Sequence, residues 1–272
     1  MSDKLNTDDK FKSDPYNPKN IFLNVDDVNN IMKSLNINNF KCNNLSLYQT
    51  AFVHKSYTEL KDYKEYDKPD GVMELQKLSY ETLEFIGDAF LGNIIANYLY
   101  KRYFYNHGED EGFLTKLKIR FVCGEQLAYL SKCLGFDKYI IISKHIDENC
   151  SGRTNSNILE DTFEAFIGAL YHDTGDFKLV ERYIINIIEK YVDFSETILH
   201  DNNYKDQILR YFQKNFSIQP KYETSKREEN NDFISFIDLP NEEIKIQGLG
   251  NTKKRAEQDV ARNALIHYRV VS

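Results

Sequence analysis

The sequence predicts two domains in one chain, an all-α helical domain followed by a small α+β domain of order α-β-β-β-α. Three observations predict this division. The length of 272 residues suits one large domain or two smaller ones. Apolar residues recur at spacings of three and four along residues 25–199, without strand-like alternation. Beyond residue 218, short alternating stretches stand between two helical patterns.

The composition is that of a globular protein. Hydrophobic residues make up 41% of the chain and charged residues 28%, which disfavours disorder, collagen and coiled coil. No apolar run approaches the roughly 18–20 residues that cross a bilayer, and the polar start lacks the apolar region of a signal peptide. We therefore expect an intracellular, cytoplasmic protein without membrane association. The four cysteines have no metal-ligand spacing, so a zinc site and a disulfide framework are poorly supported.

The expected domain boundaries follow the changes in pattern. Residues 1–24 mix Asp, Lys, Asn and Pro without periodicity, as in a flexible N-terminal extension. Residues 25–200 form the helical domain, in which the charged, Tyr-rich stretch 56–77 is expected to be a long surface loop. Residues 201–203 are the expected linker, and residues 204–272 form the small domain.

The individual elements follow from apolar spacing and from turn residues between segments. After two short helical patterns within residues 25–53, the expected long helices of the first domain are 79–104, 113–134, 156–172 and 177–199. In the second domain the expected order is a helix at 204–215, strands at 219–224, 232–237 and 243–248, and a helix at 252–268.

Carboxylates line one face of an otherwise apolar helix at residues 79–91. Glu81, Glu84 and Asp88 are spaced i, i+3 and i+7, which stacks them on one face with no opposite charge among them. Like charges at this spacing destabilise an isolated helix. Some other group must therefore neutralise the stripe.

A second apolar helix, at residues 158–170, repeats the pattern with Asp161 and Glu164 on one face. Small residues on both helices, among them Gly87 and Gly168, would permit a close crossing. Four or five carboxylates would then converge in one pocket, where a hard divalent cation, Mg²⁺ first, is the natural neutraliser. The alternative is a pair of ordinary amphipathic helices with solvated acidic faces. A di-iron centre needs Glu-x-x-His pairs, and none of the six histidines has a Glu three residues before it.

These two segments carry a resemblance to a known family. The sequence ETLEFIGDA at 81–89 closely resembles the signature helix of the ribonuclease III family, and ILEDTFEAFIGA at 158–169 is similar to its second acidic helix. Supporting matches are AFVHKS at 51–56 and EGFLTKLK at 111–118. The resemblance implies a helical endonuclease domain that hydrolyses phosphodiester bonds in double-stranded RNA and leaves 5′-phosphate and 3′-hydroxyl ends.

The resemblance also implies a role for each carboxylate. The metal-binding set would be Glu84, Asp88, Asp161 and Glu164. Of these, Asp88 and Glu164 are expected to be the indispensable catalytic residues, with Glu81 as a neighbouring support. The implied cofactor is Mg²⁺, for which Mn²⁺ can substitute.

Enzymes of this family act as homodimers, so the resemblance implies a second copy of the chain as a partner, bound through the endonuclease domain. The apolar residues Phe85, Ile86 and Phe90 of the signature helix are candidates for such an isologous contact. An ordinary place in the core of one chain explains each of them equally well.

The second domain carries its own motif. The run GLGNTKKRAEQ at 248–258 resembles the start of the last helix in double-stranded RNA-binding domains. Lys253, Lys254 and Arg255 would place three cations at a helix N-terminus, where the dipole also favours phosphate. Three basic residues are otherwise commonly a solvated face. The resemblance implies duplex RNA as a partner, recognised through its A-form shape.

Two departures from that domain affect the expected RNA contacts. Leu209 and Arg210 stand where the family often carries Gln-Glu, and the segment 227–231 replaces a Gly-Pro-x-His loop. Lys205, Arg210 and Arg227 are therefore expected to contact phosphates instead. Residues 204–272 hold 12 Lys and Arg against 10 Asp and Glu, whereas residues 1–203 hold 23 against 32, which suits an acidic site in one domain and phosphate contacts in the other.

Three hypotheses thus remain open. The leading one is an endoribonuclease that cuts double-stranded RNA. The alternative is a binding protein that sequesters duplex RNA with little or no cleavage. The third is a helical protein with chance acidic stripes. All four expected carboxylates are present, which favours the enzyme, because family members with structural roles typically lose them.

Overall fold

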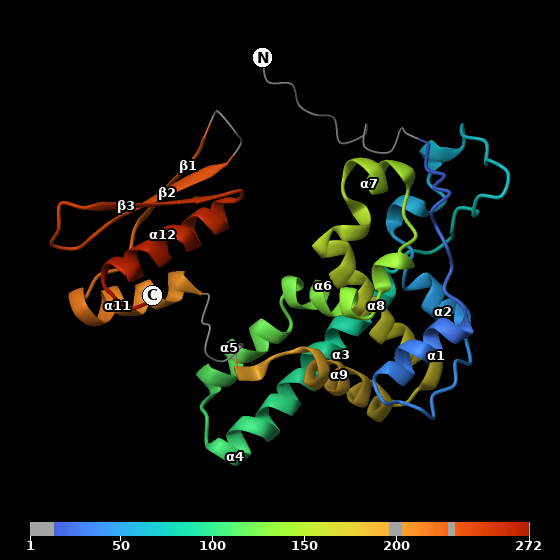
Figure 1. Ribbon diagram of the computed structural model, residues 1–272, viewed down its shortest axis with the longest axis horizontal. Coiled ribbons are helices and arrows are strands. Elements are labelled where there is room, and N and C mark those ends of the chain that lie inside the picture. Colours follow the sequence, from blue (N-terminus) through green and yellow to red (C-terminus); the bar gives the residue numbers. More distant parts are fainter. Residues whose placement is uncertain (1–13, 196–202, 228–231, 272) are drawn as a thin grey trace. The chain divides into compact units, whose positions relative to one another are not determined.

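The protein is described here as a computed structural model, which covers residues 14–195, 203–227 and 232–271. The chain divides into two compact units, Met1–Thr197 and Ile198–Ser272 (Figure 1). Residues 1–13 of the expected extension and residues 201–202 of the expected linker lie outside the described residues. The predicted fold class, an all-α domain followed by a small α+β domain, is confirmed.

Helices of very different length build the first unit. They are α1 (Val25–Ser34), α2 (Leu45–Thr50), α3 (Glu81–Leu99), α4 (Tyr105–His107), α5 (Glu111–Phe121), α6 (Gly124–Cys133), α7 (Lys144–Asn149), α8 (Ser156–Thr174) and α9 (Phe177–Tyr191). A π-helical turn, Tyr100–Phe104, joins α3 to α4. Within the described ranges, no helix combines the length and the apolar character that crossing a membrane requires.

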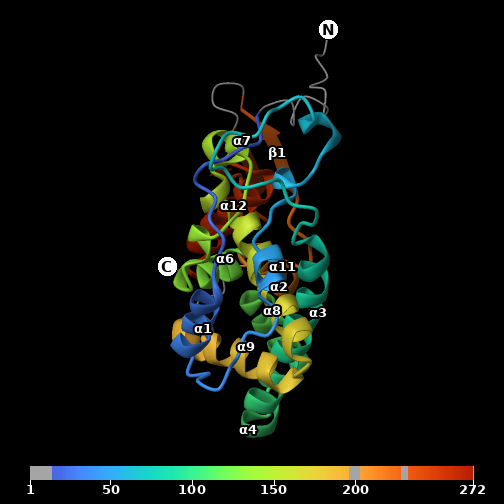
Figure 2. The same ribbon diagram turned by 90° about the vertical axis from the view of Figure 1, so that its right-hand side faces the viewer.

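Helix α8 runs through the middle of the first unit (Figures 1 and 2). It packs against α3 on one side and α6 on another, and nearly every residue from Ile158 to Leu170 is buried. Its Phe166 ring lies 5.0 Å from that of Phe136 and 5.4 Å from that of Tyr183. Such tilted aromatic pairs stabilise a core beyond the area they bury. The acidic face of α8 is therefore held by a rigid apolar core.

Part of the segment Asp14–Asn24 packs on the first unit, so the expected flexible extension of residues 1–24 does not describe these residues, and residues 1–13 are not tested. Leu23 is buried, and the side-chain amides of Asn17 and Asn20 both donate to the carbonyl of Ile142, at 3.2 and 3.0 Å. A buried carbonyl without a partner would cost stability. The segment is ordered because it satisfies a group more than a hundred residues away, a contact that local sequence pattern does not reveal.

Two further expectations are refined within the first unit. The single helix expected at 113–134 is two helices, because Cys123 adopts an extended backbone and caps α6. The stretch 56–77 is mostly irregular, as expected. Hydrogen bonds within the stretch nevertheless connect its residues to one another. The Tyr57 hydroxyl donates to the carbonyl of Met73 at 2.7 Å, and the Tyr63 hydroxyl donates to that of Ser56 at 3.1 Å.

The second unit has the predicted α-β-β-β-α order. Its elements are α11 (Tyr204–Phe216), β1 (Tyr222–Lys226), β2 (Phe233–Asp238), β3 (Lys245–Gly250) and α12 (Lys253–His267). The strands form an antiparallel sheet of order β1-β2-β3, in which Ile237 lies opposite both Tyr222 and Ile246. Both helices lie on one side of the sheet (Figure 1) and enclose a core that includes Ile208, Phe212 and Val260.

The Gly-x-Gly motif before α12 has a packing role. A Cβ on Gly248 would lie 2.1 Å from the backbone nitrogen of Val260, and one on Gly250 would lie 2.4 Å from that of Ala256. Both distances are far below van der Waals contact. The glycines therefore let α12 lie directly on β3, which fixes the basic first turn of the helix relative to the sheet.

Candidate active site and RNA-binding face

The backbones of α3 and α8 meet at two glycines. A Cβ on Gly87 would lie 1.8 Å from the carbonyl oxygen of Glu164, and a Cβ on Gly168 would lie 2.2 Å from that of Leu83. Only glycine fits at such crossings. The contact places the α3 turn that carries Glu84 and Asp88 directly against the α8 turn that carries Glu164.

The carboxylates brought together at this crossing perturb one another. Burial, followed by the charges of Asp161, Glu81, Glu160 and Asp88, raises the pKa of Glu84 to about 7. Burial, again followed by its acidic neighbours, raises the pKa of Glu164 to about 8, and only 8% of this residue is exposed. Both effects disfavour the charged form of a carboxyl group. The four residues of the expected metal-binding set thus lie within electrostatic reach of one another.

Glu160 is a further carboxylate of this cluster that the sequence analysis left out. Burial, with the charges of Asp161 and Asp88, raises the pKa of Glu160. Its side chain also lies against Gly124, the first residue of α6, where a Cβ would come within 2.2 Å of Oε2. The signal was available, because Glu160 precedes Glu164 by four residues and therefore shares its helix face.

A tyrosine holds Asp161. The Tyr80 hydroxyl donates to Oδ2 of Asp161 at 2.8 Å. Burial raises the pKa of Asp161, and this hydrogen bond opposes the increase. Burial and the charge of Asp161 move the pKa of Tyr80 upward from its ordinary value, so the hydroxyl keeps its proton. Tyr80 was also missed, and no periodic signal identifies it, because it lies just before the first residue of α3.

Glu81 differs from the other carboxylates because a cation already contacts it. Its side chain accepts from Lys55 Nζ at 3.2 Å and from the Ser79 hydroxyl at 3.0 Å. Burial by itself would raise the pKa of Glu81, but these hydrogen bonds and the charge of Lys55 outweigh it and lower the pKa. Glu81 thus lies at the edge of the cluster, beside His54, whose pKa burial lowers to about 4.

The donor chemistry of the cluster fits a hard divalent cation. Among the described residues, no Lys or Arg forms an ion pair with Glu84, Asp88, Asp161 or Glu164. Carboxylate oxygens are the preferred ligands of Mg²⁺. In the same part of the chain, no three His, Cys, Asp or Glu side chains are already arranged around a common metal position.

The three apolar residues considered for a dimer contact have different environments. Phe90 packs against aromatic residues of its own chain, with its ring 4.3 Å from that of Tyr171 and 5.8 Å from that of Phe177. Ile86 is partly buried at the crossing, where its side chain lies near Gly168. Phe85, by contrast, is 78% exposed.

The basic residues of the second unit also differ in what they contact. The exposed Lys253, Lys254 and Arg255 form the first turn of α12. Lys205 is held elsewhere, since its Nζ lies 2.6 Å from a carboxylate oxygen of the buried Glu257 and 4.7 Å from the centre of the Tyr222 ring. Lys253 lies 3.9 Å from the same carboxylate.

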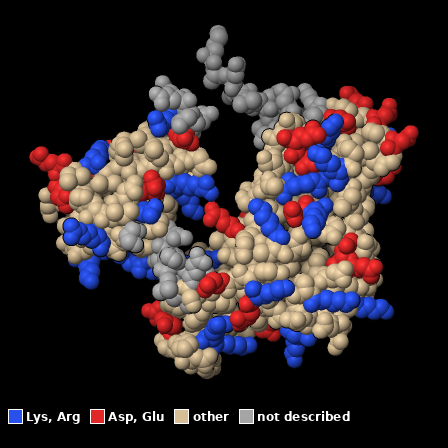
Figure 3. Space-filling view, in the orientation of Figure 1, with Lys and Arg blue, Asp and Glu red and all other residues tan. Residues whose placement is uncertain are grey.

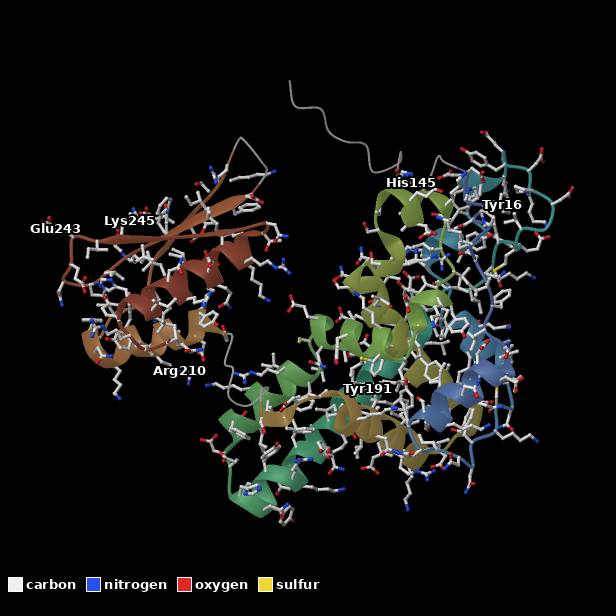
Figure 4. The ribbon with its side chains drawn as sticks, in the orientation of Figure 1. Tyr16, His145, Tyr191, Arg210, Glu243 and Lys245 are labelled. Carbon is white, nitrogen blue, oxygen red and sulfur yellow. The ribbon has the colours of Figure 1, made fainter. Side chains whose placement is uncertain are left out.

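Arg210 lies on α11 (Figure 4), where it pairs with Asp206 one turn earlier. Arg227 precedes residues 228–231, which lie outside the described residues. Lys254 forms no ion pair among the described residues, and it lines a hollow of about 580 Å³ together with Lys205, Leu209, Tyr222 and Gln258. On the face of the first unit that Figure 3 shows, acidic and basic side chains are interspersed.

Family models match both units. A model described as ribonuclease-III-like matches residues 44–191, and one described as double-stranded RNA binding motif matches residues 204–268. The probable ribonuclease 3 of Acanthamoeba polyphaga mimivirus is 35% identical over 267 residues, which cover 94% of this chain and 45% of that protein. The chain therefore spans less than half the length of this viral relative.

Shorter relatives match along most of their length. Ribonuclease 3 of Pediococcus pentosaceus is 34% identical over 225 residues, which cover 82% of this chain and 90% of that protein. Among solved structures, the nuclease domain of ribonuclease III from Campylobacter jejuni is 25% identical, with a TM-score of 0.48, and the match covers 63% of this chain and 98% of that domain. The nuclease model alone covers more than half of the chain, which therefore belongs to the ribonuclease III family and carries a double-stranded RNA-binding motif after its nuclease domain.

Proposed function

We propose that this chain is a divalent-metal-dependent endoribonuclease that hydrolyses double-stranded RNA. The observation that carries the proposal is the cluster of Glu84, Asp88, Asp161 and Glu164 at the α3–α8 crossing, where no basic side chain among the described residues neutralises it. Family membership and the RNA-binding motif of the second unit supply the substrate class.

The cluster explains why a cation would bind here. Without one, burial and mutual repulsion raise the pKa of Glu84 to about 7 and that of Glu164 to about 8, which favours the protonated form of each carboxyl group. Cation binding would displace those protons, since metal ligands bind in their ionised form. The carboxylates of Glu84, Asp88, Asp161 and Glu164 would hold the ion, which when bound would lower the pKa of a water molecule and so provide the nucleophile. Attack of water on phosphorus with cleavage of the P–O3′ bond leaves a 5′-phosphate, and the departing oxygen takes a proton to become a 3′-hydroxyl.

The second unit would hold the duplex. Exposed Lys253, Lys254 and Arg255 lie in the first turn of α12, where the positive end of the helix dipole also attracts phosphate. Thr252 caps this turn by accepting from the backbone N–H of Arg255 at 3.2 Å. Such a surface recognises the spacing of phosphates in A-form RNA rather than a base sequence.

We further propose that the chain works as a homodimer through the nuclease unit. Phe85 is 78% exposed and directly follows Glu84, so an apolar contact there would lie beside the carboxylate cluster. An isologous contact uses the same patch on both copies. Two copies would thereby place two sites near one duplex, one for each strand.

The test compares the unmodified chain with Glu164→Gln on a labelled, perfectly paired RNA of about 40 base pairs, longer than the roughly 16 that one such domain spans. Cleavage in Mg²⁺ should fall more than about 100-fold, because even outer-shell partners of a metal contribute about 10- to 100-fold. Mobility shifts in Ca²⁺ should show equal binding by both proteins. Glu148→Gln, an exposed glutamate on α7, is the matched control and should cut normally.

Product ends are mapped in the same assay, and 5′-phosphates are expected. If the unmodified chain binds the duplex but cuts it in neither Mg²⁺ nor Mn²⁺, the endonuclease proposal is overturned and RNA sequestration replaces it.

A further inference from the structure

We propose that Tyr80 is a positioning residue of the metal site, which fixes the Asp161 carboxylate at the α3–α8 crossing through its hydroxyl. The inference rests on the proposed function, because it assumes that Asp161 is a metal ligand. It adds a neutral side chain, absent from the acidic pattern of the sequence, to the residues on which cation binding depends.

The backbone of Tyr80 is fixed at the start of α3. Its N–H donates to the carbonyl of Val53 at 2.9 Å, and its carbonyl accepts from the N–H groups of Leu83 and Glu84, each at 2.9 Å. Tyr80 therefore belongs to the same helical turn as Glu84. A hydrogen bond from its side chain to Asp161 ties one proposed ligand on α8 to the turn that carries another on α3.

The side chain of Tyr80 is equally constrained. Tyr80 is only 3% exposed, and its ring packs against that of His54, with 5.9 Å between the centroids. A ring nitrogen of His54 lies 2.8 Å from the Ser56 hydroxyl, which also accepts from the backbone N–H of Ser143 at 3.0 Å. These contacts restrict the orientation of the phenol ring, so its hydroxyl is directed toward Asp161.

The bond engages only part of the carboxylate. Oδ2 of Asp161 accepts from the Tyr80 hydroxyl at 2.8 Å, and no second side-chain donor to Asp161 occurs among the described residues. The other oxygen therefore has no side-chain hydrogen bond within the described ranges that would compete with a cation. A carboxylate surrounded by like charges tends to turn away or to take a proton, and a neutral donor counters both tendencies because it bonds to the charged form. Lys or Arg in this position would compete with the cation, whereas a phenol does not.

The same unit contains a matched pair that serves as a control. The hydroxyl of the buried Tyr48 donates to Oδ2 of Asp173 at 3.0 Å. Asp173 lies three turns further along α8 than Asp161, and its carboxylate also accepts from the backbone N–H groups of Asn43 and Asn44. Removing either hydroxyl deletes one tyrosine–aspartate bond, but only Tyr80 contacts the carboxylate cluster.

The experiment measures Mn²⁺ binding to the full chain without RNA, by titration calorimetry and electron paramagnetic resonance. Tyr80→Phe should weaken Mn²⁺ binding about 10- to 100-fold, as the loss of an outer-shell partner does. Tyr48→Phe should bind Mn²⁺ like the unmodified chain. Urea unfolding of the metal-free proteins should show comparable losses of stability for the two variants, because each loses one partly buried hydrogen bond between a tyrosine and an aspartate.

A second measurement checks that Tyr80 acts through Asp161. Asp161→Asn alone should weaken Mn²⁺ binding, and adding Tyr80→Phe to it should weaken binding no further. If Tyr80→Phe binds Mn²⁺ normally while Glu164→Gln does not, Tyr80 only braces the two helices and the proposal is wrong, although the proposed function stands. If Glu164→Gln also binds normally, the carboxylate cluster is not the metal site and both proposals fall.

Discussion

Glu164 shows how burial and charge act together on one side chain. It lies on the most buried helix of the first unit, and four acidic neighbours contribute to its raised pKa. Asp88, one residue after the glycine that touches it, is exposed. Of the two residues that the family resemblance marks as indispensable, Glu164 is therefore buried and Asp88 is exposed to solvent.

The raised pKa of Glu164 predicts that the metal-free protein loses stability as the pH rises. The folded state keeps this proton up to a pH of about 8, whereas the unfolded chain releases it near 4.5. Between these values the folded state binds more protons, so the free energy of unfolding falls with increasing pH. Thermal unfolding in EDTA across this range should show a falling midpoint and a flatter profile for Glu164→Gln. An identical slope in that variant would contradict the assignment.

Single residues also mark the limit of what the sequence predicts. Helix periodicity placed Glu84 and Asp88 on one face of the first acidic helix and Asp161 and Glu164 on one face of the second, but that the two faces meet was an expectation, and the choice of these four residues came from the family resemblance. It could not reveal Lys205 bound to Glu257, since these residues are 52 positions apart and their pairing depends on how α11 packs on α12.

At the level of elements, the close crossing of α3 and α8 predicts that one methyl group added at the crossing strongly destabilises the fold. Gly87→Ala would press a Cβ against the Glu164 carbonyl, 1.8 Å away, and force the helices apart. Overpacking a core costs about 1–3 kcal/mol, occasionally more. Urea unfolding should show this loss, and RNA cleavage should fall with it because the carboxylates separate.

Gly92→Ala is the matched control on the same helix. Its Cβ would meet only the Lys118 side chain, at 3.7 Å. Alanine is favoured over glycine inside a helix by about 0.5–1 kcal/mol, so this variant should be as stable as the unmodified chain or more stable. Equal destabilisation by both substitutions would show that the crossing is not the cause.

The first turn of α12 predicts a salt-dependent effect. Lys254→Ala removes an exposed cation that forms no ion pair among the described residues, so duplex binding should weaken and the slope of log affinity against log salt should shrink by about 1. Lys245→Ala is the control, since Lys245 lies on the sheet (Figure 4) and pairs with Glu223. A slope that changes equally in both variants would place the phosphate contacts elsewhere.

The order of elements was largely predictable, because apolar periodicity is local. The ends of the helices and strands, and the breaks between them, were less predictable. Residues 113–134 carry one continuous helical pattern, yet the chain turns at Cys123 so that α6 can pack on α8. Asp14–Asn24 is polar and aperiodic, yet it is ordered through Ile142. In both cases a tertiary contact overrides the local pattern.

At the level of the whole molecule, the exposed Phe85 predicts a specific defect in assembly. Phe85→Asp should convert a dimer into a monomer in sedimentation velocity, while metal-free thermal unfolding of the chain changes little because the side chain is 78% exposed. Tyr105→Asp is the control, an aromatic residue that is 72% exposed beyond the other end of α3. A Phe85 variant that sediments like the unmodified chain would place the dimer contact on another surface.

The division into two units was predictable because each unit encloses its own core. Ile208, Phe212 and Val260 pack with one another in the second unit, and the aromatic residues around Phe166 do so in the first. The acidic excess of residues 1–203 and the slight basic excess of residues 204–272 follow the same division.

The glycine crossing has a consequence for protein design. Because α3 and α8 touch through main-chain atoms at Gly87 and Gly168, the distance between the two acidic stripes is set by the backbone and not by any side chain. The length of each side chain on the stripes then determines how far its carboxylate reaches across this fixed distance. A designer who wishes to build a carboxylate metal centre into an unrelated helical bundle should transplant the two glycines first and choose the ligands afterwards.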